Sequence, residues 1–161
     1  MSDSRDKFLG ELNPNIRVVH KICRIYFRDK DERDDVFQEI MYQLWKSYGK
    51  FQGESKFSTW MYKVALNTAL THIRKINKIP EKEKLKDAYH QISEIPQEDK
   101  AELLYDSINT LNAIDKAIIF LYLEQNSYDE IAAITGLTKS NVSVKIVRIK
   151  KVLEERLKRI K

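Results

Sequence analysis

A row of polar side chains beside a tryptophan stands out in the segment KFSTWMYKVALNTALTHIRK, residues 56–75. Amide, hydroxyl and cationic groups bind phosphate oxygens and base edges, and an indole ring stacks on an exposed base. On a helix, at about 100° per residue, the row shares one narrow face: Trp60, Lys63, Asn67, Thr71 and Arg74. This face, called the polar strip below, is suited to nucleic-acid binding. For the strip taken alone, however, an ordinary surface row with one half-buried aromatic side chain is the preferred interpretation.

The rest of the same helix is apolar on two adjoining sides. One side includes Phe57, Met61 and Ala65, and the other includes Tyr62, Leu66 and Leu70. A helix with so wide an apolar surface is buried between neighbouring elements. We therefore expect it to be held on two sides, with only the polar strip exposed.

A second row of polar and aromatic residues lies in DDVFQEIMYQLW, residues 34–45, within a helix expected from about Glu32 to Tyr48. Opposite its apolar stripe of Phe37, Ile40, Met41 and Leu44 lie Asp35, Gln38, Glu39, Tyr42 and, at the edge, Trp45. Acidic and aromatic residues on one face suggest a protein partner with basic helices. Taken alone, an ordinary solvated face is the preferred interpretation. The sequence shows no sign of a cleft or an adjacent metal site, so these carboxylates do not suggest acid–base catalysis.

The segment SYDEIAAITGLTKSNVSVKIVRIKKVL, residues 127–153, has the pattern of a helix-turn-helix. Ser127 and Glu130 form a capping-box sequence, Gly136 ends the first helix, and Thr138 caps the last. The last helix is expected to enter a DNA major groove, and the alternative is a plain helical hairpin. Its outward face carries Ser140, Ser143, Val144, Val147, Arg148 and Lys151.

Metal and nucleophile chemistry find little support in the sequence. His20 and Cys23 share one face of a helix expected at residues 15–28, but no second ligand pair follows, so we expect both in the core. No Gly-rich phosphate loop or nucleophile elbow occurs, and we expect no metal, no cofactor and no catalytic residue. A single cysteine excludes an internal disulfide.

Composition predicts an all-α fold. The chain of 161 residues has a net charge of +5, four glycines and three prolines, too few turn residues for a β-protein. The longest apolar run, residues 117–123, is too short to insert in a membrane, so we expect a cytoplasmic protein. Residues 77–100 are rich in Lys and Glu and are expected to be a flexible linker between two small helical domains, residues 1–76 and 101–161.

In this order, these motifs resemble the extracytoplasmic-function (ECF) sigma factors of bacterial RNA polymerase, over nearly the whole chain after residue 10. The segment ERDDVFQEIMYQLW resembles the helix of region 2 that docks on the β′ coiled coil. The resemblance implies docking residues Asp34, Asp35, Gln38, Glu39, Tyr42 and Trp45. The linker matches the place of the family's connector.

The segment FQGESKFSTWMYKVALNTALTHIRK resembles the loop and helix that melt and read the −10 promoter element. The loop, residues 50–56, would receive a flipped base. The residues implied in −10 contacts are Phe51, Lys56, Trp60, Lys63, Asn67, Thr71 and Arg74.

The helix-turn-helix resembles region 4, which reads the −35 element and sits on the β flap. The residues implied are Lys139, Ser140, Ser143, Val144, Arg148 and Lys151. The chain departs from the usual pattern in three ways. Leu66 replaces a common basic residue, Asn112-Ala113 replaces a common Leu-Pro, and Val144 and Val147 stand where polar or basic residues are frequent.

The resemblance implies a non-enzymatic sigma factor that binds core polymerase and promoter DNA, often controlled by an anti-sigma factor. A stand-alone helix-turn-helix regulator is the alternative, but it would have no use for a second DNA strip and an acidic docking face. A nucleic-acid-modifying enzyme is disfavoured because no catalytic set is found.

Overall fold

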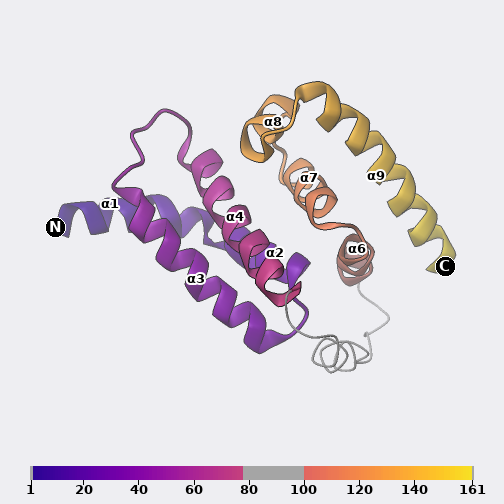
Figure 1. Cartoon of the computed structure of the whole chain (residues 1–161), viewed down its shortest axis with the longest axis horizontal. Helices are drawn as coiled ribbons and strands as arrows, with labels where there is room; N and C mark the ends of the chain where they lie inside the picture. The colour runs from indigo at the N-terminus through magenta and orange to yellow at the C-terminus, as the bar shows by residue number, and fades with distance from the viewer. Residues whose placement is uncertain (1, 78–99, 161) are drawn as a thin grey trace. The chain divides into compact units, whose positions relative to one another are not determined.

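The computed structural model describes residues 2–77 and 100–160 of the chain. The predicted linker therefore lies outside the described residues except for its two end positions. The described residues divide into two compact units, one with helices α1 to α4 and the other with α6 to α9 (Figure 1). Every regular element in these ranges is helical, which confirms the predicted all-α class. No helix among them is long and apolar enough to cross a membrane.

The first unit begins with a helix that was not predicted, α1 (Ser2–Leu12). A short 3-10 turn, η1 (Asn13–Asn15), joins it to α2 (Ile16–Tyr26). Phe8 and Leu12 of α1 are buried, and the Phe8 ring lies 5.2 Å from that of Trp45. Tertiary burial of these two side chains therefore holds a short helix that has few apolar residues.

Helix α3 (Lys30–Tyr48) starts at Asp29, whose carboxylate accepts a hydrogen bond from the backbone N–H of Glu32. Its buried residues are Val36, Ile40 and Leu44. Phe37 and Met41, which were predicted to belong to the apolar stripe, are only half-buried. The buried face of α3 is therefore rotated by about one residue from the predicted stripe.

The prediction of a core histidine was wrong. His20 is exposed, and its ring stacks on Phe37 at 4.3 Å. The buried face of α2 instead consists of Val19, Ile22, Cys23, Ile25 and Tyr26. Ile22 and Ile25 point inward because α2 packs against both α3 and α4.

Helix α4 (Phe57–Asn77) is buried on two sides, as predicted, between α2 and α3. Met61, Tyr62, Ala65, Leu66 and Ala69 are its buried residues. Full burial of a Met or Leu side chain contributes about 1.5–3 kcal/mol through the area that it removes from water. The departure at Leu66 thus places an apolar side chain at a buried position of the core.

The second unit contains α6 (Lys100–Asn109), α7 (Ala113–Leu123), α8 (Tyr128–Thr135) and α9 (Lys139–Ile160). Its core joins Ile118 and Leu121 of α7 to Ile131 of α8 and Ile146 of α9, all fully buried. Helix α9 packs against each of the other three helices. Helix α9, which is expected to enter the major groove, is thus supported along its inner face.

The helix boundaries of this unit follow the predicted caps. Ser127 and Glu130 form a capping box, Gly136 has a φ of +81°, and the Thr138 hydroxyl accepts a hydrogen bond from the N–H of Asn141. Asn112 caps α7, because its side chain accepts from the N–H of Asp115 at 2.9 Å. The departure at Asn112-Ala113 thus supplies a helix cap.

Candidate nucleic-acid interface

The polar strip lies on the outer side of α4, as predicted. Lys63, Asn67, Thr71 and Arg74 are exposed, and Trp60 is half-buried. The Thr71 hydroxyl donates to the carbonyl of Asn67 at 2.8 Å, which holds Thr71 against its own helix. At about 1.5 Å per residue the strip extends for roughly 21 Å. It therefore offers a continuous polar and cationic surface.

Trp60 is anchored at one end of the strip by other aromatic rings. Its centroid lies 5.1 Å from that of Phe51, 5.4 Å from Phe57 and 6.0 Å from Tyr48. These four residues, called the aromatic cluster below, join the end of α3, the loop and the start of α4. The cluster fixes the half-buried Phe51, one of the two predicted loop contacts. The other, Lys56, is exposed just before α4.

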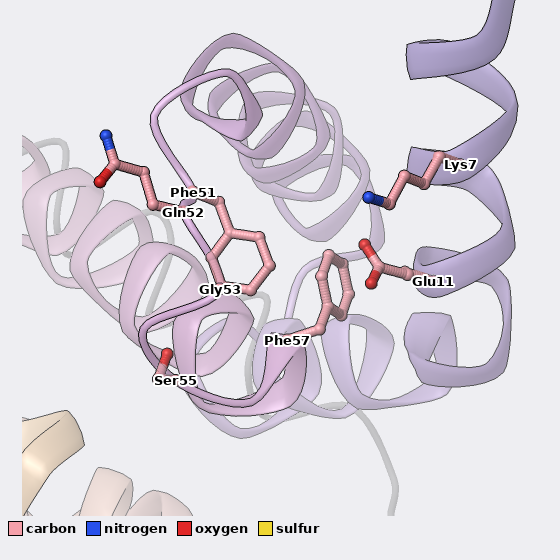
Figure 2. Close-up of a pocket in the computed structure, with 7 residues that line it drawn as sticks. All are labelled: Lys7, Glu11, Phe51, Gln52, Gly53, Ser55 and Phe57. Carbon is pink, nitrogen blue, oxygen red and sulfur yellow. The ribbon is translucent and has the colours of Figure 1, made fainter.

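A hollow of about 450 Å³ lies beside the aromatic cluster (Figure 2). Its lining comes from α1, the loop and the first residue of α4, and consists of Lys7, Glu11, Phe51, Gln52, Gly53, Ser55 and Phe57. Gly53 has a φ of +72°, a left-handed conformation that favours glycine at the turn of the loop. The loop that was predicted to receive a base therefore does border a hollow.

The two α1 residues in that hollow were missed by sequence reasoning. The Tyr48 hydroxyl donates to Oε2 of Glu11 at 2.8 Å. Burial, followed by this hydrogen bond to the carboxylate, raises the pKa of Tyr48, so the phenol stays protonated and remains a donor. The only signal for these residues was the spacing of Phe8 and Leu12, which puts Lys7 and Glu11 together on a second face of a helix.

The predicted docking residues are all exposed on α3. Tyr42 is 56% exposed and Trp45 is 46% exposed, although one side of Trp45 rests on Phe8. Glu39 accepts a hydrogen bond from Gln43 at 3.0 Å. The docking face, as used below, consists of Asp34, Asp35, Gln38, Glu39, Tyr42 and Trp45. Its aromatic and acidic groups are open to a partner.

A groove of about 410 Å³ between α3 and α4 brings Glu39 of the docking face beside Asn67 and Thr71 of the polar strip. His72 lines the same groove, packs edge-on against Phe27 at 5.3 Å and lies 3.8 Å from Glu32. Burial, and then the charge of Lys75, lower the pKa of His72 despite nearby carboxylates. The sequence did not predict that the two surfaces would share a groove.

Helix α9 carries the predicted −35 residues on its outer face. Lys139, Ser140, Val144, Arg148 and Lys151 are exposed, and Ser143 is half-buried. Val144 and Val147 are 56% and 53% exposed. Lys139 also lies 3.5 Å from Asp129 in an exposed ion pair, which is worth little in water. The face combines apolar, hydroxyl and cationic groups.

His20 and Cys23 occupy different surroundings, since His20 is exposed and Cys23 is buried. Burial raises the pKa of Cys23 to about 11, which disfavours the thiolate that a metal would need. In residues 2–77 and 100–160, no group of three potential ligands is arranged to hold a metal ion.

Comparison with known proteins gives two family matches that follow the two units. Residues 12–79 match Sigma-70 region 2, and residues 101–153 match Sigma-70, region 4.

Among curated relatives, RNA polymerase sigma-H factor of Pseudomonas aeruginosa is 38% identical over 61 residues, or 36% of this chain and 32% of the relative. This match spans only about a third of that relative's own length. ECF RNA polymerase sigma-E factor of Haemophilus influenzae is 26% identical over 88% of this chain and 84% of the relative.

Two solved structures share the fold. The sigma factor RpoE, in a complex with the anti-sigma factor NepR from Bartonella quintana, has a TM-score of 0.73 and 20% identity, covering 94% of this chain and 97% of that chain. CnrH, in a complex with the cytosolic domain of CnrY, has a TM-score of 0.69 and 18% identity, covering 96% and 89%.

The fold and the two matched regions together define a class of protein. All-helical chains that combine a region 2 unit with a region 4 helix-turn-helix are sigma-type transcription factors. The chain belongs to the sigma-70 family, and within it to the ECF sigma factors.

Proposed function

We propose that this chain is the promoter-specificity subunit of a bacterial RNA polymerase. Residues 1–76 act as region 2, residues 101–161 as region 4, and residues 77–100 as the connector. The observation that carries the proposal is the presence of two separate surfaces suited to DNA, the polar strip and the face of α9, in one chain of the ECF type. The polymerase performs the chemistry, and this chain supplies sequence recognition.

Region 2 opens the DNA at the −10 element. Bases released from pairing are captured by stacking and by hydrogen bonds to their edges, which favours the open state. The strip supplies cations for phosphates and Asn67 for a base edge, while Trp60 supplies an aromatic surface. The −10 residues are Phe51, Lys56, Trp60, Lys63, Asn67, Thr71 and Arg74.

The docking face binds the basic helices of the β′ coiled coil. Opposite charges steer the encounter, and the aromatic rings of Tyr42 and Trp45 provide contact area. Because Glu39 shares a groove with Asn67, the bound polymerase lies next to the DNA that is being opened.

Helix α9 enters the major groove of the −35 element, and the same unit contacts the β flap. Exposed Arg148 and Lys151 bind phosphates, while Ser143 and Val144 meet base edges. The −35 residues are Lys139, Ser140, Ser143, Val144, Arg148 and Lys151.

We further propose that the protein works in the cytoplasm, where the polymerase is, and that an anti-sigma factor controls it. The structural relative RpoE is bound to an anti-sigma factor, which supports this second point.

The stand-alone helix-turn-helix regulator is the competing function. The discriminating experiment compares binding of the purified chain to core polymerase and to duplex DNA alone, followed by run-off transcription of a genomic library with the reconstituted enzyme. A sigma factor binds core polymerase and starts transcription at discrete promoters. Tight operator binding without any affinity for core polymerase would contradict the proposal.

A further inference from the structure

The hollow beside the aromatic cluster has a corner made of two aromatic rings (Figure 2). The centroids of Phe51 and Phe57 lie 6.0 Å apart, and their planes meet at 81°. A flat ring that stacks on one of them meets the edge of the other, and the perpendicular arrangement excludes a sandwich. The corner therefore suits one planar heterocycle.

Two oppositely charged side chains from α1 complete the hollow. Figure 2 shows Lys7 and Glu11, one turn apart, extending toward the hollow. An ammonium group only donates hydrogen bonds, and a carboxylate only accepts them. A ligand in the hollow therefore meets a donor and an acceptor side by side.

Tyr48 limits how Glu11 can act. Its hydroxyl donates to Oε2, which leaves Oε1 as the acceptor for a ligand. Glu11 is half-buried and Lys7 is exposed, so the acceptor lies at the inner end of the hollow and the donor near its mouth.

The hollow also continues the polar strip. Trp60, at the end of the strip, contacts both Phe51 and Phe57. A single strand that follows the strip along α4 is thus led to the aromatic corner, and one of its bases can enter with its sugar at the mouth.

On this basis, and resting on the proposed function, we propose that Lys7 and Glu11 select the unpaired base that enters the hollow. The exocyclic group at the far edge of the base reaches Glu11, and the neighbouring ring nitrogen reaches Lys7. Cytosine and adenine place an amino group at that edge, which donates to the carboxylate. Thymine and guanine place a carbonyl oxygen there, which the carboxylate repels.

The variant Glu11→Gln gives the sharpest test. Tyr48 donates to the amide oxygen, as it does to Oε2 now, and the amide nitrogen then becomes a donor facing the hollow. The wild-type chain is expected to favour cytosine or adenine at one −10 position by about tenfold. Glu11→Gln should reduce that preference strongly, because the amide donor no longer accepts from an amino group, while Lys7 still donates to a ring nitrogen that accepts. Asp6→Asn, an exposed change on the same helix, is the matched control and should keep the wild-type profile.

Two assays separate this inference from the proposed function. In the first, core polymerase with the full-length chain transcribes a promoter library randomised at −10. In the second, the full-length chain alone binds short oligothymidines that carry one central cytosine, adenine, guanine or thymine. Lys7→Met, with Arg5→Met as its control, should reduce discrimination in both.

A reduced preference for cytosine or adenine in Glu11→Gln, in either assay, supports base selection. The same result with oligonucleotides alone supports it even if transcription fails. An active wild-type holoenzyme whose base profile is unchanged by Glu11→Gln would overturn the inference while leaving the sigma function in place. A loss of activity or binding in Glu11→Gln that is equal for all four bases would also overturn the inference. If the holoenzyme does not transcribe, oligonucleotide binding by the wild-type chain that does not depend on the central base would overturn it.

Discussion

The hydroxyl of Tyr48 donates a 2.8 Å hydrogen bond to Oε2 of Glu11, and so joins the end of α3 to α1 across 37 positions of the chain. Hydrogen bonds to charged groups contribute about 1.5–3 kcal/mol when they are shielded from water. This one is only partly buried, so Tyr48→Phe should lower the free energy of unfolding by about 1 kcal/mol. Unfolding in urea measures this change in the free energy of unfolding. Tyr42→Phe removes an exposed hydroxyl and should change stability by less than about 0.5 kcal/mol.

Cys23 should react slowly with thiol reagents in the folded protein. Burial raises its pKa from 9.0 to about 11, so at pH 8 the thiolate is about a hundredfold rarer than in the unfolded chain. A group with a raised pKa stabilises the fold fully below pH 9, and this contribution is lost as the pH rises through about 11. Labelling with an aromatic disulfide at pH 8, with and without urea, measures the reactivity. Equal rates in both conditions would contradict the burial of the thiol.

Charge reversal on the docking face should weaken binding to core polymerase. Asp35→Lys combined with Glu39→Lys places cations against the basic helices of the partner, while exposed positions usually affect stability by less than about 0.5 kcal/mol. Affinity is measured by pull-down with core polymerase, and folding by circular dichroism. The matched control is Glu154→Lys with Glu155→Lys, two exposed changes on α9. Undiminished affinity in the α3 variant would exclude this face as the dock.

Asn67→Ala and Trp60→Ala should impair promoter opening and spare core binding. Stacking of a base on an aromatic ring is worth about 1–3 kcal/mol, so loss of Trp60 should reduce open complexes about tenfold or more. Permanganate footprinting on a cognate promoter reports unpaired thymines. Because Trp60 also packs on Phe51 and Phe57, its variant needs a thermal melt as a control. Asn67 is exposed and does not belong to the aromatic cluster, so its variant does not raise this question of stability. Normal thymine reactivity in both variants would exclude Asn67 and Trp60 from promoter melting.

Local patterns predicted the parts of this molecule that local interactions determine. The capping box at Ser127 and Glu130, the turn at Gly136 and the two buried sides of α4 all follow from spacing along one helix. The exposed polar strip followed for the same reason. What failed depended on contacts between distant segments.

Helix α1 is the clearest such failure. It has few apolar residues, and its position depends on Phe8 packing near Trp45 and on Glu11 bonding Tyr48. Because helix α1 was not predicted, Lys7 and Glu11 could not be assigned to the hollow from the sequence. His20 was misplaced because a one-position rotation of α2, set by packing on α3 and α4, exposes it.

Val144 and Arg148 should affect −35 recognition in different ways. Val144 is 56% exposed on the outer face of α9, where a solvated helix would carry a polar group. A methyl-bearing side chain there can contact a thymine methyl in the major groove, whereas Arg148 suits a phosphate. Val144→Ser should therefore change the preference at one −35 position by about 1 kcal/mol. Arg148→Ala should weaken all −35 sequences alike and flatten the salt dependence of binding.

A promoter library randomised at −35, transcribed by each variant holoenzyme at several salt concentrations, measures both effects. Val147→Ser is the matched control for Val144→Ser, because Val147 is 53% exposed on the same face but is not among the proposed −35 residues. A sequence profile that Val144→Ser leaves unchanged would exclude the methyl contact. It would favour the alternative that Val144 and Val147 together bind a protein, such as an anti-sigma factor, since exposed apolar pairs often mark interfaces. Loss of anti-sigma binding in both valine variants would then be the expected result.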